Sequence, residues 1–132
     1  MKIFTKDNTH WDTKVNFVDE NNVYFGYDMA GQCCEHFGWF LADETVIPKT
    51  WDEYEEMSKL KTDINTDLSD FVFDTSYFNK FYCENVYDLG MVILRIVNQD
   101  HSKEKFIHVY NCHNGYYSHG FEFKDNENSY SF

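Results

Sequence analysis

The feature that most constrains the fold is the run at residues 91–97, in which every residue except Arg95 is apolar. A run of this kind is typical of a strand at the centre of a sheet, because both faces of such a strand are buried. It is far shorter than the roughly 18 apolar residues that cross a membrane. We therefore expect a β-rich core around this strand and no membrane span.

Other β-rich runs surround this central segment. Residues 14–18 and 23–27 predict a hairpin, because the acidic and Asn residues between them tolerate left-handed turn conformations. Gly38 allows a bulge or a close backbone approach within another short strand. The predicted short strands are residues 37–41, 71–73, 77–83, 105–110 and 116–123.

One helix is predicted to begin after Thr50. Thr50 and Glu53 match a capping box, in which the hydroxyl accepts from the third helical amide and the carboxylate reaches back. The acidic residues that follow Thr50 are explained by capping and by a solvated face. An apolar stripe at three-residue spacing is formed by Trp51, Tyr54, Met57 and Leu60. The prediction is an α+β fold, with a mainly antiparallel sheet of about six strands and one substantial helix packed on it.

The 132 residues fit one domain, residues 1–132, with a polar tail at 125–132 that is expected to fray. The start of the chain lacks the apolar run of a signal peptide, which favours a cytoplasmic location. In that compartment we expect the four cysteines to be reduced thiols.

The formal net charge is −12, with 23 acidic residues against 11 basic residues. An excess of carboxylates repels phosphate backbones and anionic membranes, so direct nucleic-acid or membrane binding is disfavoured. Hydrophobic residues make up 42% of the chain, which is enough for a core and unlike a disordered acidic tail. The charge instead favours a partner protein with a basic surface.

Two polar segments, residues 33–36 and 112–119, contain Cys and His. Their adjacent Cys and Cys-His pairs lack the spacing of structural zinc ligands. Cys34 could act as a nucleophile with a histidine of either segment as its base, but the spacing does not enforce that contact. We expect no metal, no cofactor and no enzymatic activity.

The pairing of Cys33-Cys34-Glu35 with Asn114-Gly115-Tyr116-Tyr117-Ser118 resembles a family of small uncharacterised proteins of bacteriophages and bacteria. In that family a short strand follows the Cys-Cys-Glu segment, and the Asn-Gly-Tyr-Tyr-Ser segment opens the final strand. His36 stands here where the family usually has Ser or Thr. The resemblance implies a compact β-rich domain of phage type.

Two functions are predicted from these features. The first is a counter-defence inhibitor that binds and blocks a host antiviral protein, as a nucleic-acid mimic would, because carboxylates and aromatic side chains can fill a basic groove. The alternative is a small-molecule binder that sequesters a nucleotide immune signal, since a polar aromatic cluster can stack a base. The candidate binding residues are Glu35, Asn114, Tyr116, Tyr117 and Ser118.

A purely structural interpretation of both motifs stays open. Cys33 and Cys34 would then pack under the sheet, and Gly115 would turn the last hairpin. In either case we expect Glu35 and the hairpin at residues 114–118 to lie side by side at one end of a sheet, because a carboxylate there needs hydrogen-bond donors.

Overall fold

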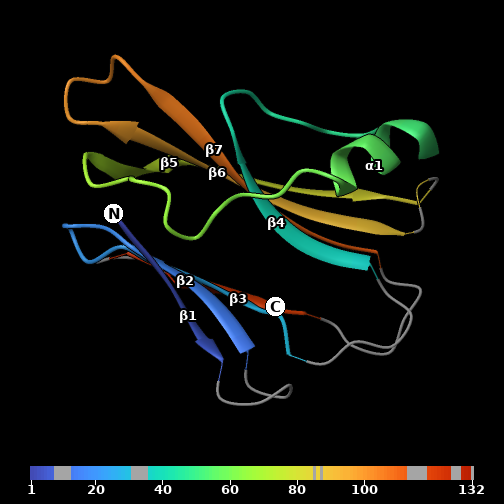
Figure 1. Ribbon diagram of the computed structural model, residues 1–132, viewed down its shortest axis with the longest axis horizontal. Helices are drawn as coiled ribbons and strands as arrows, with labels where there is room; N and C mark the ends of the chain where they lie inside the picture. Colours follow the sequence, from blue (N-terminus) through green and yellow to red (C-terminus); the bar gives the residue numbers. More distant parts are fainter. Residues whose placement is uncertain are drawn as a thin grey trace.

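The fold consists of two antiparallel sheets facing each other, with one helix on the outer face of the second sheet (Figure 1). The computed structural model describes residues 1–7, 13–30, 36–84, 86, 88–112, 119–125 and 129–131. The predicted α+β class and the antiparallel pairing are confirmed. The strands form two sheets rather than one, and the helix is short.

Sheet A has five strands in the order β1-β2-β3-β8-β9, and every neighbouring pair is antiparallel. It contains the predicted hairpin as β2 and β3, in which Asn22 of the connecting turn has a φ of 60°. The strands of sheet A are Lys2–Asp7 (β1), Thr13–Val18 (β2), Tyr24–Asp28 (β3), Phe121–Lys124 (β8) and Ser129–Ser131 (β9).

Sheet B has four strands in the order β4-β7-β6-β5. The apolar run at residues 91–97 lies in β6, between β5 and β7, and this confirms its central position. A shift of register interrupts the β5–β6 pairing between Phe73 and Phe78. The strands of sheet B are His36–Ala42 (β4), Phe71–Cys83 (β5), Leu89–Asn98 (β6) and Glu104–Cys112 (β7).

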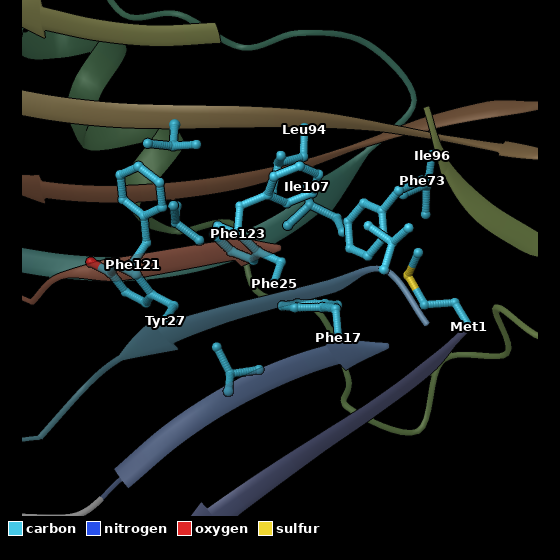
Figure 2. Packing of buried hydrophobic residues seen from close by; sticks show 14 of the residues in the cluster. Met1, Phe17, Phe25, Tyr27, Phe73, Leu94, Ile96, Ile107, Phe121 and Phe123 are labelled. Atoms are coloured by element: carbon cyan, nitrogen blue, oxygen red, sulfur yellow. The ribbon is translucent and has the colours of Figure 1, made fainter. Parts of the chain in front are cut away.

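Aromatic and branched side chains from both sheets form the main core (Figure 2). Phe17 and Phe25 of sheet A are fully buried, and the ring of Phe25 lies 5.9 Å from that of Phe121. Phe73 of sheet B meets Phe123 of sheet A edge to face at 5.7 Å. Burial of several such rings is the main stabilising contribution of the sandwich.

A buried carboxylate joins the two sheets. Asp19, in the turn after β2, is 4% exposed. Its Oδ1 accepts from the backbone N–H groups of Asn21 and Val23, each at 2.9 Å, and its Oδ2 accepts from the N–H of Phe73 at 2.9 Å. These bonds fix the hairpin of sheet A against β5 of sheet B and satisfy the buried charge.

The helix, α1 (Trp51–Ser58), lies on the face of sheet B that points away from sheet A. The Thr50 hydroxyl accepts from the Glu53 N–H at 3.2 Å, as predicted. The Glu53 carboxylate bonds the N–H of Lys49 rather than that of Thr50. Tyr54 and Met57 are buried in a second core cluster with residues of sheet B.

The remaining differences concern the ends of the chain and the length of the helix. β1 was not expected, because only two apolar residues occur in its six-residue segment. β9 falls within the predicted tail and pairs with β8. α1 has 8 residues and ends at Ser58, so Leu60, the last residue of the predicted apolar stripe, lies beyond the helix. Within the described residues, no helix is long and apolar enough to span a membrane.

Candidate functional site

All eight residues singled out in the two motifs lie outside the described residues: Cys33, Cys34, Glu35, Asn114, Gly115, Tyr116, Tyr117 and Ser118. Their contact with one another, and the nucleotide-binding function built on it, therefore stay predictions. The described residues beside these motifs do meet. His36 and Cys112 are partners in the β4–β7 pairing, and the Asp28 N–H donates to the Gly120 carbonyl at 2.8 Å.

Two residues of these segments, Cys112 and His119, are buried in the fold. His119 stacks on Phe37 at a centroid distance of 3.8 Å, and its Nδ1 lies 3.1 Å from the Asp28 carbonyl oxygen. Cys112 is a fully buried free thiol, and burial raises its pKa, which keeps it protonated. Among the described side chains, no group of three or more His, Cys, Asp or Glu could hold a metal ion.

A groove beside α1 is the most developed candidate site in the described part of the chain. It has a volume of about 680 Å³ and lies between α1 and the preceding loop. Met57 forms part of its lining, and the side chains of Ile47 and Leu60 stand at its edge with 40% and 43% of their surface exposed. The groove is therefore an open, shallow hollow with exposed apolar side chains at its edge.

Two hydrogen bonds hold the loop that forms one wall of this groove. The Lys49 N–H donates to Glu53 Oε2 at 2.6 Å, which ties the loop to the first turn of α1. The Val46 N–H donates to His108 Nε2 at 2.9 Å, which ties the loop to β7 of sheet B. The groove is thus supported from the helix and from the sheet.

His108 is a neutral imidazole held in one orientation. It is fully buried and stacks on Phe40 with ring centroids 4.3 Å apart. Nε2 accepts from Val46, so Nδ1 carries the proton and donates to the Phe106 carbonyl at 3.1 Å. Burial lowers the pKa of His108 to about 4, which agrees with the neutral tautomer.

The charges around the groove are mostly negative. Its lining contains the carboxylates of Asp52, Glu53 and Glu56 and one ammonium group, that of Lys49. Glu56 also forms an exposed ion pair with Lys59 at 3.0 Å. The acidic start of the helix, expected to be a capped and solvated face, therefore also borders an apolar hollow.

A second hollow, of about 510 Å³, lies beside Met1 and the turn after β2. Its buried polar groups are already used within the fold, because Asp19 binds three backbone amides and the Met1 amino group donates to the Leu68 carbonyl at 2.9 Å. The groove beside α1 is the stronger candidate for binding a partner.

Sequence reasoning missed the role of His108 and the groove itself. One signal was present: the stripe from Trp51 to Leu60 is longer than the face that packs on sheet B, and Ile47 and Pro48 add apolar surface just before the helix. An apolar stripe that exceeds its packing face leaves exposed apolar residues, and these can mark a binding surface.

Comparison of the chain with protein-family models, with curated proteins and with solved structures found no match. The resemblance to the phage family therefore stays a prediction.

Proposed function

We propose that this protein is a non-catalytic counter-defence inhibitor of phage type, which binds and blocks a host antiviral protein through that protein's basic surface. Its carboxylates would occupy the basic surface as a nucleic-acid backbone does. Attraction between opposite surface charges accelerates association and favours such a partner over acidic proteins.

The observation that supports this proposal is the position of the negative charge. Among the residues whose burial the structure describes, Asp19 is the one buried carboxylate, and the other Asp and Glu side chains reach the surface at least in part. These surface carboxylates are therefore available to a partner.

Several of the basic groups are already paired within the fold. Arg95, the single arginine of the chain, bridges Asp74 and Glu104, each at 2.8 Å. Lys105 pairs with Asp43 at 2.8 Å, and Lys124 pairs with Glu122 at 2.7 Å. Because each pair uses a carboxylate as well as a cation, the excess of 23 acidic over 11 basic residues remains and the net charge stays strongly negative.

The test is capture from a host lysate by the immobilised protein, with captured proteins identified by mass spectrometry. We expect a basic partner whose affinity falls at least about tenfold between about 50 mM and about 500 mM NaCl, because screening weakens attraction between exposed charges. Duplex DNA added as competitor should displace it. Capture of no basic partner at low salt, or capture that salt and DNA leave unchanged, would contradict the proposal.

Charge variants provide a matched control with opposite signs. Glu44→Gln, Glu55→Gln and Asp70→Asn remove exposed negative charges and should weaken capture. Lys61→Gln and Lys103→Gln remove positive charges and should strengthen it. Equal capture by both sets would show that the negative surface is not what the partner recognises.

A further inference from the structure

Exposed apolar side chains concentrate around α1. The described residues include four large apolar side chains that are clearly exposed: Ile47, Trp51, Leu60 and Tyr82. Three of them belong to α1 or to its immediate flanks. Scattered single apolar residues are normal on a surface, whereas a group of them beside a hollow marks a contact site.

The groove that Ile47 and Leu60 line is formed without a partner. Its volume of about 680 Å³ is bounded on one side by the loop held by the His108–Val46 and Glu53–Lys49 bonds. Met57 is 1% exposed and anchors α1 on sheet B beneath the groove. A preformed groove loses little conformational entropy when it binds, which favours affinity.

The charge of the lining selects among occupants. Three carboxylates, those of Asp52, Glu53 and Glu56, stand against Lys49 and the Lys59 that pairs with Glu56, so the rim keeps a negative balance that repels phosphates and acidic segments. A segment that places Leu- or Ile-like side chains in the hollow and Lys or Arg over the rim would match both the apolar hollow and its acidic rim. A nucleic acid would match neither the hollow nor the rim.

We infer that the groove beside α1 binds a segment of the partner protein in which apolar side chains alternate with Lys or Arg. This inference rests on the proposed function and gives the basic partner a contact point. The apolar side chains provide the anchor in the hollow, and the basic side chains pair with the acidic rim.

The test uses the isotope-labelled full chain and two synthetic peptides of equal length, one of Leu and Lys and one of Leu and Glu. We expect the Leu/Lys peptide to cause saturable shifts in the amide signals of residues 46–60, and the Leu/Glu peptide to cause none. Shifts spread over the whole surface, or equal binding of both peptides, would overturn the inference.

Variants distinguish the groove from general attraction. Ile47→Ser with Leu60→Ser removes exposed apolar surface at the groove and should weaken Leu/Lys binding by about tenfold or more. Tyr82→Ser removes an exposed ring on β5 and should leave the affinity unchanged. Thermal unfolding verifies that each variant folds. Equal affinities of the two variants for the Leu/Lys peptide would show that the peptide does not bind in the groove.

The outcomes separate this inference from the proposed function. If the wild-type protein captures a basic host protein and the Ile47→Ser, Leu60→Ser variant captures it equally, the groove does not bind the partner, while the proposed function stands. If the peptide binds in the groove but no basic host protein is captured, the inference about the groove stands and the proposed function fails.

Discussion

Asp19 shows how one residue can join two sheets. Its three hydrogen bonds reach the hairpin of sheet A and Phe73 of sheet B, 54 positions along the chain. A carboxylate buried to this degree stabilises the fold only while it accepts hydrogen bonds. The backbone N–H groups that donate to it would in turn cost free energy if they were buried without an acceptor. Asp19 therefore joins the sheets alongside the aromatic core and the bond from the Tyr27 hydroxyl to the Tyr110 carbonyl.

We predict that Asp19→Ala lowers the free energy of unfolding by about 3 kcal/mol, because three backbone amides lose a charged acceptor. Asp19→Asn keeps one acceptor oxygen and should cost less. Urea unfolding monitored by fluorescence gives both values, with Glu20→Ala on the exposed neighbouring position as the control. An Asp19→Ala variant as stable as Glu20→Ala would contradict this account of the junction.

His108 makes the stability of the fold depend on pH. Its pKa is about 4 in the folded protein and near the ordinary value of 6.5 when unfolded. The unfolded chain therefore binds the proton more readily between these values. The stability from the neutral imidazole is complete above pH 6.5 and falls as the pH decreases towards 4, a loss of about 3 kcal/mol.

Urea unfolding across this pH range measures that loss. The carboxylates titrate in the same range, so His108→Gln, which does not titrate, is the reference, and its stability should fall by less between pH 6.5 and 4 than that of the wild type. Imidazole titration by NMR gives the folded pKa directly. A value near 6.5 would show that burial and the bond from Val46 do not favour the neutral ring in the folded protein.

At the scale of elements, β4 and β7 fit together through a glycine. Gly38 pairs with Tyr110, and a Cβ added at Gly38 would lie 2.8 Å from the Tyr110 hydroxyl oxygen and 3.1 Å from the ring carbon that bears it. Of the bulge or close backbone approach predicted at Gly38, the structure has no bulge, because the β4–β7 register is continuous, and it is the Tyr110 side chain that lies close to the glycine. The Tyr110 ring lies over the glycine and packs edge to face against Tyr54 of α1 at 6.1 Å.

We predict that Gly38→Ala destabilises the protein by about 2 kcal/mol, since the added methyl group overpacks this contact. Tyr110→Phe removes the nearest atom, so the double variant should recover part of the loss. A double-mutant cycle of unfolding free energies measures this coupling. Strictly additive effects would show that the two side chains do not compete for the same space.

α1 illustrates how little a short helix contributes alone. Eight residues are too few for a stable isolated helix, and the cap at Thr50 contributes only about 1 kcal/mol. The helix exists because Tyr54 and Met57 are buried on sheet B. Its exposed apolar neighbours are therefore presented by tertiary packing rather than by helix propensity.

At the scale of the whole molecule, the charge of −12 acts on the compact state. Like charges held close together in the fold repel one another, and salt screens this repulsion beyond a Debye length of about 10 Å at 0.1 M. The exposed ion pairs offset little of this repulsion, because such pairs contribute about 1 kcal/mol at most.

We predict that the melting temperature rises by several degrees between about 10 mM and about 500 mM NaCl, because screening relieves the repulsion. Differential scanning calorimetry measures this shift. Sodium chloride is preferred to sulfate, which stabilises most proteins by exclusion from their surface. A melting temperature that falls with salt would mean that the ion pairs outweigh the net charge.

The local features of the fold were predictable from the sequence. The apolar run of β6, the turn residues between β2 and β3, and the Thr50 cap each depend on a few consecutive residues, and the structure has all three. The candidate site was less predictable. The apolar stripe at α1 and the acidic residues beside it were visible in the sequence. That both line the same groove was not visible.

The sequence by itself determined the central strand, the hairpin of β2 and β3 and the start of the helix, because hydrophobic period, turn chemistry and capping act within a few residues. Only the tertiary structure decided that the strands divide between two sheets, that Asp19 joins them, and that His108 supports the groove. These arrangements depend on residues such as Asp19 and Phe73, or Val46 and His108, which lie more than fifty positions apart. Such contacts form only when burial of both partners offsets the entropy of closing long loops, and no local pattern encodes that balance.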